Sequence, residues 1–234
     1  MRYVDRVEQT TGRLRRTESQ AQTRERLLDA AAAVFTRRGY DGASVDDIAE
    51  AAGFSKGAVY ANFESKEALF LALFDRCLED QDREVRAIMA REPDPLARLA
   101  AIGRWVPAFA GGLREWRLLE TEFWVQAARL PALRRGLATR YQAQRGAIAV
   151  LLDEHYAALG AAPPLPTPRL AAAVVAMIGG LAMQQITDIA AIPPDLYAST
   201  LALLLRPSDG DGTVEQLITA PSPTPLRLET QLPS

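Results

Sequence analysis

The sequence predicts an all-α protein built from a small N-terminal three-helix unit and a larger C-terminal helical bundle. Apolar residues recur at three- and four-residue steps, which is the period of a helix with one buried face. No segment rich in Val, Ile and Thr alternates as a strand would. Breaks such as Gly39 and the Pro-Asp-Pro sequence at 93–95 separate the periodic segments.

Composition favours a soluble globular protein and makes several functions improbable. Hydrophobic residues form 48% of the chain and charged residues 24%, which lies outside the disordered range. The formal net charge is −2, so any surface for nucleic acid must be a local patch. Cys77 and His155 are the only residues of their kinds, which argues against disulfides, zinc sites and His-based triads. We therefore expect no catalytic residue, metal or cofactor.

The sequence also indicates a cytoplasmic protein without membrane contact. Its N-terminus is polar and Arg-rich, unlike a secretory signal. The longest apolar runs, such as 170–183, are shorter than about 18 uninterrupted residues and are typical of a buried helix. We expect His155 on a solvated helix face and Cys77 as a passive occupant of its helix.

The N-terminal domain is expected at residues 22–68, after a flexible basic arm at 1–21. The arm lacks apolar periodicity and contains five arginines; the sequence leaves open whether it contacts DNA or is simply solvated. A helical pattern begins near Thr23 and ends at Gly39, a typical C-terminal glycine. Its apolar positions include Leu27, Leu28, Ala31, Val34 and Phe35.

Two short capped helices follow the first one. Ser44 and Asp47 have the spacing of a capping box, and Gly53 supplies a left-handed residue that ends the helix. Ser55 then caps a second short helix. Two short helices joined by a Gly-containing turn form a helix-turn-helix, whose second helix fits the major groove of DNA.

The outward side of that second helix suits DNA. Lys56 stands at its N-terminus, where backbone amides already favour a phosphate. Gly57 costs about 1 kcal/mol of helix stability relative to Ala, but it allows the helix backbone to approach DNA closely. Ala58 can touch a thymine methyl group. Tyr60 and Asn62 can donate hydrogen bonds to phosphates.

The two lysines of the chain, Lys56 and Lys66, both stand where this arrangement needs a phosphate contact. Capped helices with a glycine turn also occur in bundles that bind no nucleic acid. Spacing alone therefore leaves DNA binding and a purely structural role open.

A specific set of short motifs favours the first of these alternatives. The motifs are Gly39-Tyr40 and residues 44–49, 52–57, 59–60, 62–63 and 65–69. Together they resemble the N-terminal signature of the TetR family of bacterial transcriptional regulators, over roughly residues 23–74. The chain departs from the signature at Asn62, where the family most often has His, and at Ala43, where a hydroxyl residue is common.

The resemblance implies a role for each matching position. Lys56, Gly57 and Ala58 would face bases, whereas Tyr60, Asn62 and Lys66 would hold phosphates. Ser44 would lie at the helix end that abuts the DNA backbone. The candidate DNA-binding residues are Ser44, Ser55, Lys56, Gly57, Ala58, Tyr60, Asn62 and Lys66.

The rest of the chain is expected to form a ligand-sensing and dimerisation domain at 69–206, followed by a disordered tail at 207–234. Further helices are predicted at 66–91, 95–110, 114–130, 131–159, 169–190 and 194–205. The tail is rich in Pro, Ser, Thr, Gly and Asp, a composition typical of disorder.

Residues 120–129, 133–141 and 180–184 resemble a common class of TetR regulatory domains. The resemblance implies a homodimer formed through the helices at 169–190 and 194–205. An apolar stripe supports it, and Gly179-Gly180 would let helices approach closely. The stripe comprises Leu170, Val174, Ile178, Leu181 and Ile186. The same stripe would also suit the core of a monomer.

Aromatic residues are concentrated in the middle helices, where the family usually has its ligand cavity. Candidate ligand-binding residues are Trp105, Phe109, Trp124, Tyr141 and Gln184. We expect a mainly apolar organic ligand. Most of these aromatics could equally fill an ordinary core.

These observations predict a TetR-type regulator that binds double-stranded operator DNA as a dimer and is released by a small-molecule effector. Activation instead of repression is an alternative within the same fold. A protein-interaction module with a degenerate helix-turn-helix is an alternative of a different class. The sequence specifies neither the effector, the operator nor the regulated genes.

Overall fold

The structure, a computed structural model, describes residues 2–112, 114–188, 190–193 and 195–208, with side chains described from residue 20 onward except at 107–116. Within these residues every regular element is a helix, which confirms the all-α prediction. The helices are α1 (Arg2–Gly42), α2 (Val45–Ala52), α3 (Lys56–Asn62), α4 (Lys66–Arg91), α5 (Pro95–Gly112), α6 (Arg114–Arg129), α7 (Pro131–Leu159), α8 (Thr167–Thr187) and α9 (Asp195–Leu204).

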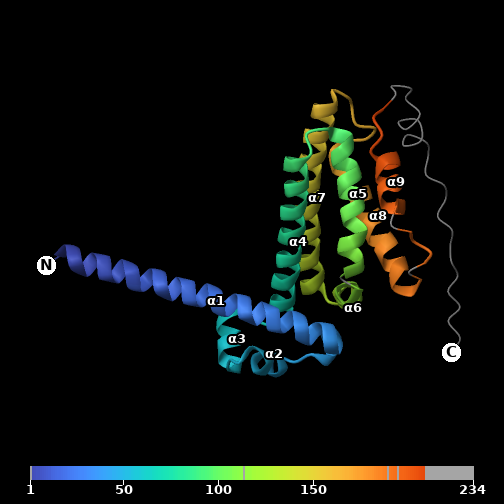
Figure 1. Ribbon diagram of the computed structural model, residues 1–234. Coiled ribbons are helices and arrows are strands. Elements are labelled where there is room, and N and C mark those ends of the chain that lie inside the picture. The colour runs from blue at the N-terminus through green and yellow to red at the C-terminus, as the bar shows by residue number, and fades with distance from the viewer. Residues whose placement is uncertain (1, 113, 189, 194, 209–234) are drawn as a thin grey trace, which may run out of the picture.

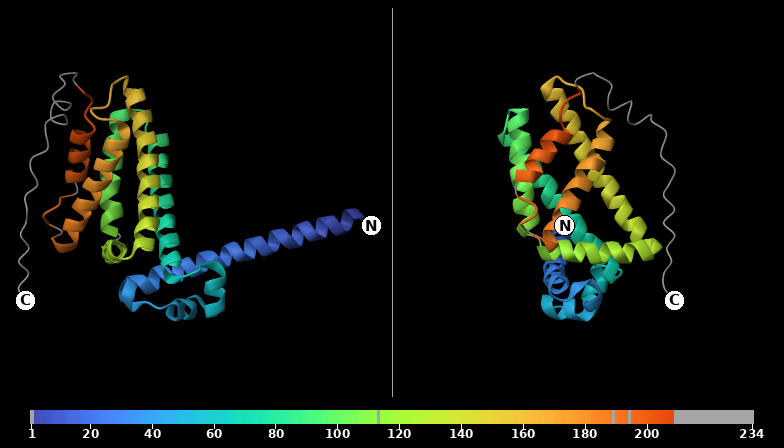
Figure 2. Two further views of the ribbon diagram at one scale, coloured as in Figure 1. Left: turned by 180° about the vertical axis from the view of Figure 1, so that it is seen from behind. Right: turned by 90° about the vertical axis from the view of Figure 1, so that its right-hand side faces the viewer.

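The helices form a small unit, α1–α3, attached to one end of a bundle (Figure 1). In the bundle α4 packs against α5 and α7, and α8 and α9 lie on the opposite side from α4. The right-hand view of Figure 2 shows α6 lying across the end of the bundle, between it and the small unit. Helix α6 is therefore the crossing element between the two parts.

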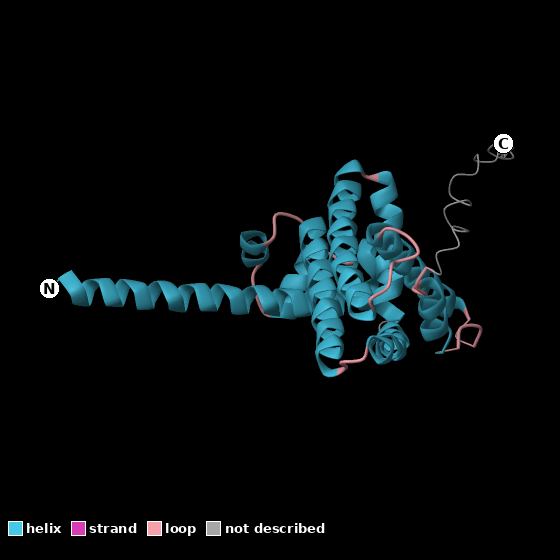
Figure 3. Cartoon of the chain, turned by 90° about the horizontal axis from the view of Figure 1, so that it is seen from above, coloured by secondary structure: helices cyan, strands magenta, loops and turns pink. Residues whose placement is uncertain are grey.

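The N-terminal segment differs from the sequence prediction. Residues 2–21 form a continuous helix with the rest of α1, so no helix begins near Thr23. Figure 3 shows this part of α1 extending away from the bundle. The sequence predicted a flexible arm here because apolar periodicity is missing; such a pattern indicates a missing packed face, and a chain without Pro can still be helical.

The predicted domain boundary at residue 68 falls inside a continuous core. The first turns of α4 bury Leu69, Phe70, Leu73 and Phe74 among the apolar side chains of α1–α3. The same cluster includes residues of α6 and α7. Because α4 shares this core with α1–α3, α6 and α7, the small unit and this end of the bundle are packed as one. Of the predicted tail, residues 209–234 lie outside the described residues.

Several helix ends follow their predicted signals. Asp94 accepts a hydrogen bond from the amide of Ala97 (2.7 Å) and caps α5. The last long helix, α8, ends at Thr187 rather than at 190. The side chain of Asp188 accepts hydrogen bonds from the amides of Ala190 and Ala191, which stabilises a turn instead of another helical turn.

His155 is buried, with 7% of its surface exposed, so the prediction of a solvated histidine was wrong. Burial, and then the positive charge of Arg98, lower the pKa of His155. Cys77 is half-buried, and burial raises the pKa of its thiol to about 11, so the thiol stays protonated near neutral pH.

Gly39 interrupts α1 with φ 72° and ψ 173°, a conformation that is essentially restricted to glycine. A Cβ atom at this position would also lie 2.8 Å from Oε2 of Glu122. We predict that Gly39→Ala lowers the free energy of unfolding by about 1–3 kcal/mol, measured by urea denaturation.

Gly146→Ala is the matched control, because a Cβ atom there would meet nothing within 4 Å. In the middle of α7 the added methyl group should leave stability unchanged or raise it by up to about 1 kcal/mol. Equal effects of the two substitutions would contradict the role assigned to Gly39.

Candidate DNA-binding surface and effector cavity

The predicted capping box starts α2. The amide of Asp47 donates to Oγ of Ser44 (3.1 Å), and the amide of Ser44 donates to Oδ2 of Asp47 (3.0 Å). Arg38 forms an ion pair with the other carboxylate oxygen at 2.6 Å. The hydrogen bonds from Ser44, followed by the charge of Arg38, lower the pKa of Asp47. The start of α2 is therefore fixed by local contacts.

The turn between α2 and α3 also has the predicted geometry. Gly53 adopts a left-handed conformation, with φ 71° and ψ 32°, and its amide donates to the last turn of α2. The side chain of Ser55 accepts a hydrogen bond from the amide of Ala58 (3.2 Å) and caps α3. Val59 and Phe63 are buried and attach α3 to the core.

The opposite side of α3 is exposed. Lys56, Gly57 and Tyr60 face solvent, and Ala58 is half-buried. A Cβ atom at Gly57 would make only an ordinary 3.7 Å contact with Ser55, so internal packing does not require glycine there. Next to the exposed Lys56, the first turn of α3 thus presents only the small residues Gly57 and Ala58, which permits close approach of another backbone.

The two lysines occupy different environments. Lys56 is exposed and forms an ion pair with Asp46 at 2.8 Å, and this hydrogen bond raises the pKa of Lys56. Nζ of Lys66 donates to the carbonyl oxygens of Tyr40 (2.9 Å) and Ala43 (3.1 Å) and lies 4.4 Å from the centre of the Tyr40 ring. Lys66 therefore stabilises the end of α1, with one of its three N–H donors left over.

Asn62 is also engaged internally. Its Nδ2 donates to the carbonyl oxygen of Ala58 (2.8 Å), one turn earlier in α3. The side chain is half-buried, in contrast to that of Tyr60. The structure thus brings Lys56, Gly57 and Tyr60 to one exposed surface and leaves Asn62 at its edge.

Two arginines of α1, which sequence reasoning missed, hold the ends of the short helices. Arg24 donates to the carbonyl oxygen of Asn62 and stacks on the Phe63 ring at 4.3 Å. Arg26 donates to the carbonyl oxygen of Ala52 and stacks on a second ring, that of Phe54, at 4.7 Å. Both guanidinium groups lie at the negative ends of helix dipoles. No local sequence signal indicates these contacts, because the partners are more than 25 residues away.

The bundle contains a cavity of about 1090 Å³, lined by residues of α4–α9. Three predicted ligand-binding residues, Trp105, Trp124 and Tyr141, line it. Gln184 is exposed and lies outside the lining, so the structure does not bring it to the cavity. Its neighbour in the sequence, Met183, is exposed as well but does line the cavity. Phe109 lies among the residues whose side chains the structure does not describe.

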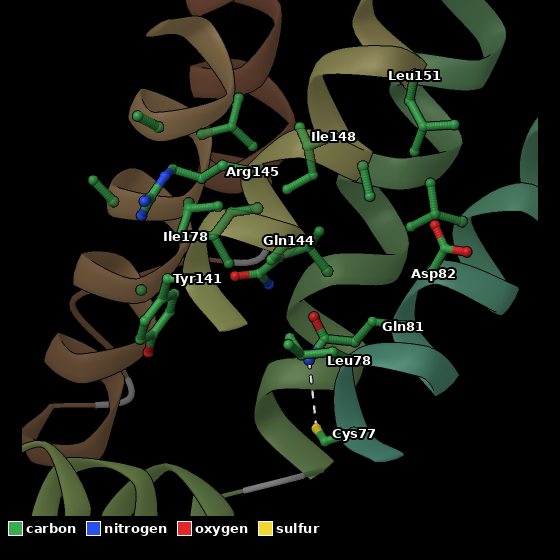
Figure 4. A pocket seen from close by; sticks show the side chains of 18 of the residues that line it. Cys77, Leu78, Gln81, Asp82, Tyr141, Gln144, Arg145, Ile148, Leu151 and Ile178 are labelled. Atoms are coloured by element: carbon green, nitrogen blue, oxygen red, sulfur yellow. Dashed lines mark hydrogen bonds between the residues drawn. The ribbon is translucent and has the colours of Figure 1, made fainter. Parts of the chain in front are cut away.

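The cavity contains polar groups that sequence reasoning missed (Figure 4). They have no local motif, since α4, α6 and α7 contribute them separately. They include Gln81, Arg117, Glu120, Gln144 and Arg145.

A hydrogen-bonded chain connects several of these groups. Trp124 Nε1 donates to the hydroxyl of Tyr141 (2.7 Å), which donates to Oε1 of Glu120 (2.9 Å). Arg117 forms an ion pair with Oε2 of the same carboxylate at 2.8 Å. Burial, and then the charge of Glu120, raise the pKa of Tyr141. The α6 side of the cavity is thus internally paired.

Helix α6 also contacts the end of α1, on its other face. The amide of Tyr40 donates to Oε2 of Glu122 at 2.7 Å, and Gln126 donates to the side chain of Asp41 at 2.7 Å. Phe123 is buried, with its ring centre 5.1 Å from that of Tyr40. Residues that line the cavity therefore alternate along α6 with residues that hold α1.

Comparison with known proteins agrees with this geometry in both parts of the chain. The family "Bacterial regulatory proteins, tetR family" matches residues 27–73, and "BetI-type transcriptional repressor, C-terminal" matches residues 95–206. The chain belongs to the TetR family. The first TetR match contains the capped pair of helices, and the second contains most of the cavity.

Individual TetR relatives match about a third of this chain. The chain is 41% identical over 85 residues to the regulator TtgR of Pseudomonas putida, covering 36% of this chain and 40% of TtgR. It is 41% identical over 78 residues to the activator FasR of Mycolicibacterium smegmatis, covering 33% and 36%. A solved TetR-family regulator from Rhodococcus sp. matches with TM-score 0.64 and 25% identity, over 77% of this chain and 95% of that one. The curated relatives are thus matched over less than half of their length.

The internal contacts of Lys66 yield a stability prediction. Lys66→Met should lower the free energy of unfolding by about 1–3 kcal/mol, because two half-buried carbonyl oxygens lose their donor. Lys56→Met is the control, and urea denaturation should show wild-type stability because Lys56 is exposed. A Lys66→Met protein as stable as wild type would show that these hydrogen bonds contribute nothing to the fold.

Proposed function

We propose that this protein is a cytoplasmic transcriptional regulator that binds operator DNA as a homodimer and responds to a small, mainly apolar organic effector. The observation that carries the proposal is the exposed first turn of α3, which is fixed by caps and arginines and presents the small Gly57 and Ala58 beside the exposed Lys56. Family membership supports the same function. The cavity beyond α6 provides a place for the effector.

In the proposed complex α3 enters the major groove. Gly57 and Ala58 approach the bases, the Lys56 ammonium neutralises a phosphate, and the Tyr60 hydroxyl donates to another phosphate. Ser55 can add a phosphate contact, since its oxygen caps α3 and its O–H has no acceptor among the described residues. Ser44 differs, because its hydroxyl already donates to Asp47. It would act by positioning α2.

Asn62 and Lys66 have a smaller part in this proposal than the family resemblance implies. Asn62 uses its amide to bind the preceding turn, and Lys66 has only one N–H left for a phosphate. Both positions would mainly maintain the shape of the surface that Lys56 and Tyr60 present.

Lys56→Ala should weaken binding to every DNA sequence and lower the slope of log affinity against log salt by about 1, because one phosphate charge is no longer neutralised. Tyr60→Phe should weaken binding several-fold and leave the salt slope unchanged, since it removes a neutral donor. Gel shifts with a fragment from upstream of the protein's own coding region, over a series of salt concentrations, would measure both.

Arg83→Ala is the matched control, because it removes a positive charge from the exposed face of α4, away from α3. Its affinity and salt slope should equal those of wild type. Wild-type affinity in both α3 variants would refute the proposed surface.

An incompletely covered apolar face supports the homodimer. By length and composition alone α8 could cross a membrane, but one such helix is weak evidence for a membrane span. Only 22% of the most apolar window of α8 is buried within the chain. Gly179 and Gly180 have open space where a Cβ would lie, and Met183 is 54% exposed, although all three also line the cavity. On α9, Leu203 is 75% exposed. A second copy covering these helices would bury this apolar surface.

Leu203→Glu should raise the dimer dissociation constant at least about tenfold, since it would place a charge in the apolar interface. Sedimentation velocity over a concentration series would show the shift toward monomer. Leu96→Glu, on α5, is the control, because Leu96 is similarly exposed (62%) and lies outside the proposed interface. Dimers of wild-type stability in Leu203→Glu would argue that α9 is not at the interface.

The effector would act by favouring one of two arrangements of the reading helices. We propose repression, with release of DNA when the effector binds. The C-terminal match is to a repressor type, whereas FasR is named an activator. A reporter gene downstream of the bound fragment distinguishes the two. Deleting the regulator raises expression under repression and lowers it under activation.

A further inference from the structure

We propose that the effector is a neutral, largely apolar molecule with one hydrogen-bond donor, a hydroxyl or an amide N–H, and that the side-chain amide of Gln144 anchors it. This inference rests on the proposed function and names the chemical class of its effector. It depends on three features of the cavity: an unpaired amide, a balanced set of charges and a large apolar wall.

The Gln144 amide has no hydrogen-bond partner among the residues that the structure describes. Its Oε1 is buried and makes no hydrogen bond, although Gln144 lines the cavity. In Figure 4 the side chain extends from α7 into the space where Leu78 of α4 and Ile178 of α8 also point. An unpaired carbonyl oxygen in apolar surroundings is costly, and a half-turn of the amide would direct this oxygen into the cavity. A donor on the effector would restore the missing hydrogen bond.

The charged groups of the cavity give an ionic ligand no net attraction. Four carboxylates and four arginines line it, so their formal charges cancel. Both oxygens of Glu120 already accept hydrogen bonds, from Arg117 and Tyr141. Asp75 is paired with Arg140 at 2.6 Å. An ionic ligand would have to displace these partners, whereas a neutral one would not.

Arg145 is the half-buried exception, since it makes no hydrogen bond or ion pair with the other described residues; Glu79, which is also unpaired among them, is exposed. Figure 4 shows Arg145 directed toward the side of α8, away from Gln144 and α4. An anionic effector held by Arg145 is therefore the specific alternative that an experiment must separate from the neutral one.

The remaining wall is suited to a bulky apolar body. Trp105, Ile148 and Ile178 are among its apolar residues. The volume of about 1090 Å³ lies at the upper end of the range for small-molecule sites. Gln81 contributes a second carboxamide, whose only hydrogen bond among the described residues is one of 3.4 Å to Sγ of Cys77. Sulfur is a weak acceptor, so Gln81 can turn toward a ligand.

The test uses the full-length protein without DNA and three probes of similar shape: 4-phenylphenol, its methyl ether and 4-phenylbenzoate. Isothermal calorimetry should show that wild type binds the phenol about tenfold more tightly than the ether, which lacks the donor, and more tightly than the carboxylate. In Gln144→Leu the preference for phenol over ether should fall below about threefold, while the ether still binds. Gln142→Leu, an exposed position on the same helix, should retain the full preference.

The inference is overturned if neither neutral probe binds, if the preference survives in Gln144→Leu, or if the carboxylate binds most tightly. Circular dichroism verifies folding, and Gln144→Met, which keeps the length of the side chain, replaces the leucine variant if that one does not fold. Because binding is measured without DNA, these outcomes are independent of the proposed regulation. An intact preference combined with unchanged DNA affinity would count against the proposed function alone.

Discussion

The whole arrangement depends on the packing of α6 against the end of α1. The rings of Phe70 and Phe123 stack with their centres 4.0 Å apart, and Tyr40 meets both edge-on. Beside this cluster the Glu122 carboxylate accepts a hydrogen bond from the amide of Tyr40, in the space that Gly39 leaves by lacking a Cβ. These contacts join three segments far apart in the sequence. Without them the two short helices would be attached to the bundle through α4 alone.

The same helix faces the cavity with its other residues. Glu120, Thr121 and Trp124 line the cavity, whereas Glu122 and Phe123 contact α1. A molecule that displaces α6 must therefore move or strain the turn immediately before α2. Coupling of this kind needs the effector to bind one arrangement more tightly than the other. The position of α6 gives a direct physical route by which this difference could reach α3.

The sequence predicted the features that depend on neighbouring residues. The Ser44 cap, the left-handed Gly53 and the Ser55 cap all involve partners within four residues, so a short motif contains the whole interaction. The internal position of Lys66 and the exposure of Gln184 were not predictable, because each depends on how distant helices pack. The helical N-terminal segment was missed for another reason, since periodicity reports packing and not helix formation itself.

The most direct test of the central claim is amide hydrogen exchange at Tyr40, whose N–H donates to Glu122. In Glu122→Ala the Tyr40 amide should exchange at least about tenfold faster than in wild type. Glu84→Ala, an exposed site on α4, should leave its rate unchanged. Equal Tyr40 rates in wild type and Glu122→Ala would contradict the claim that α6 holds the end of α1.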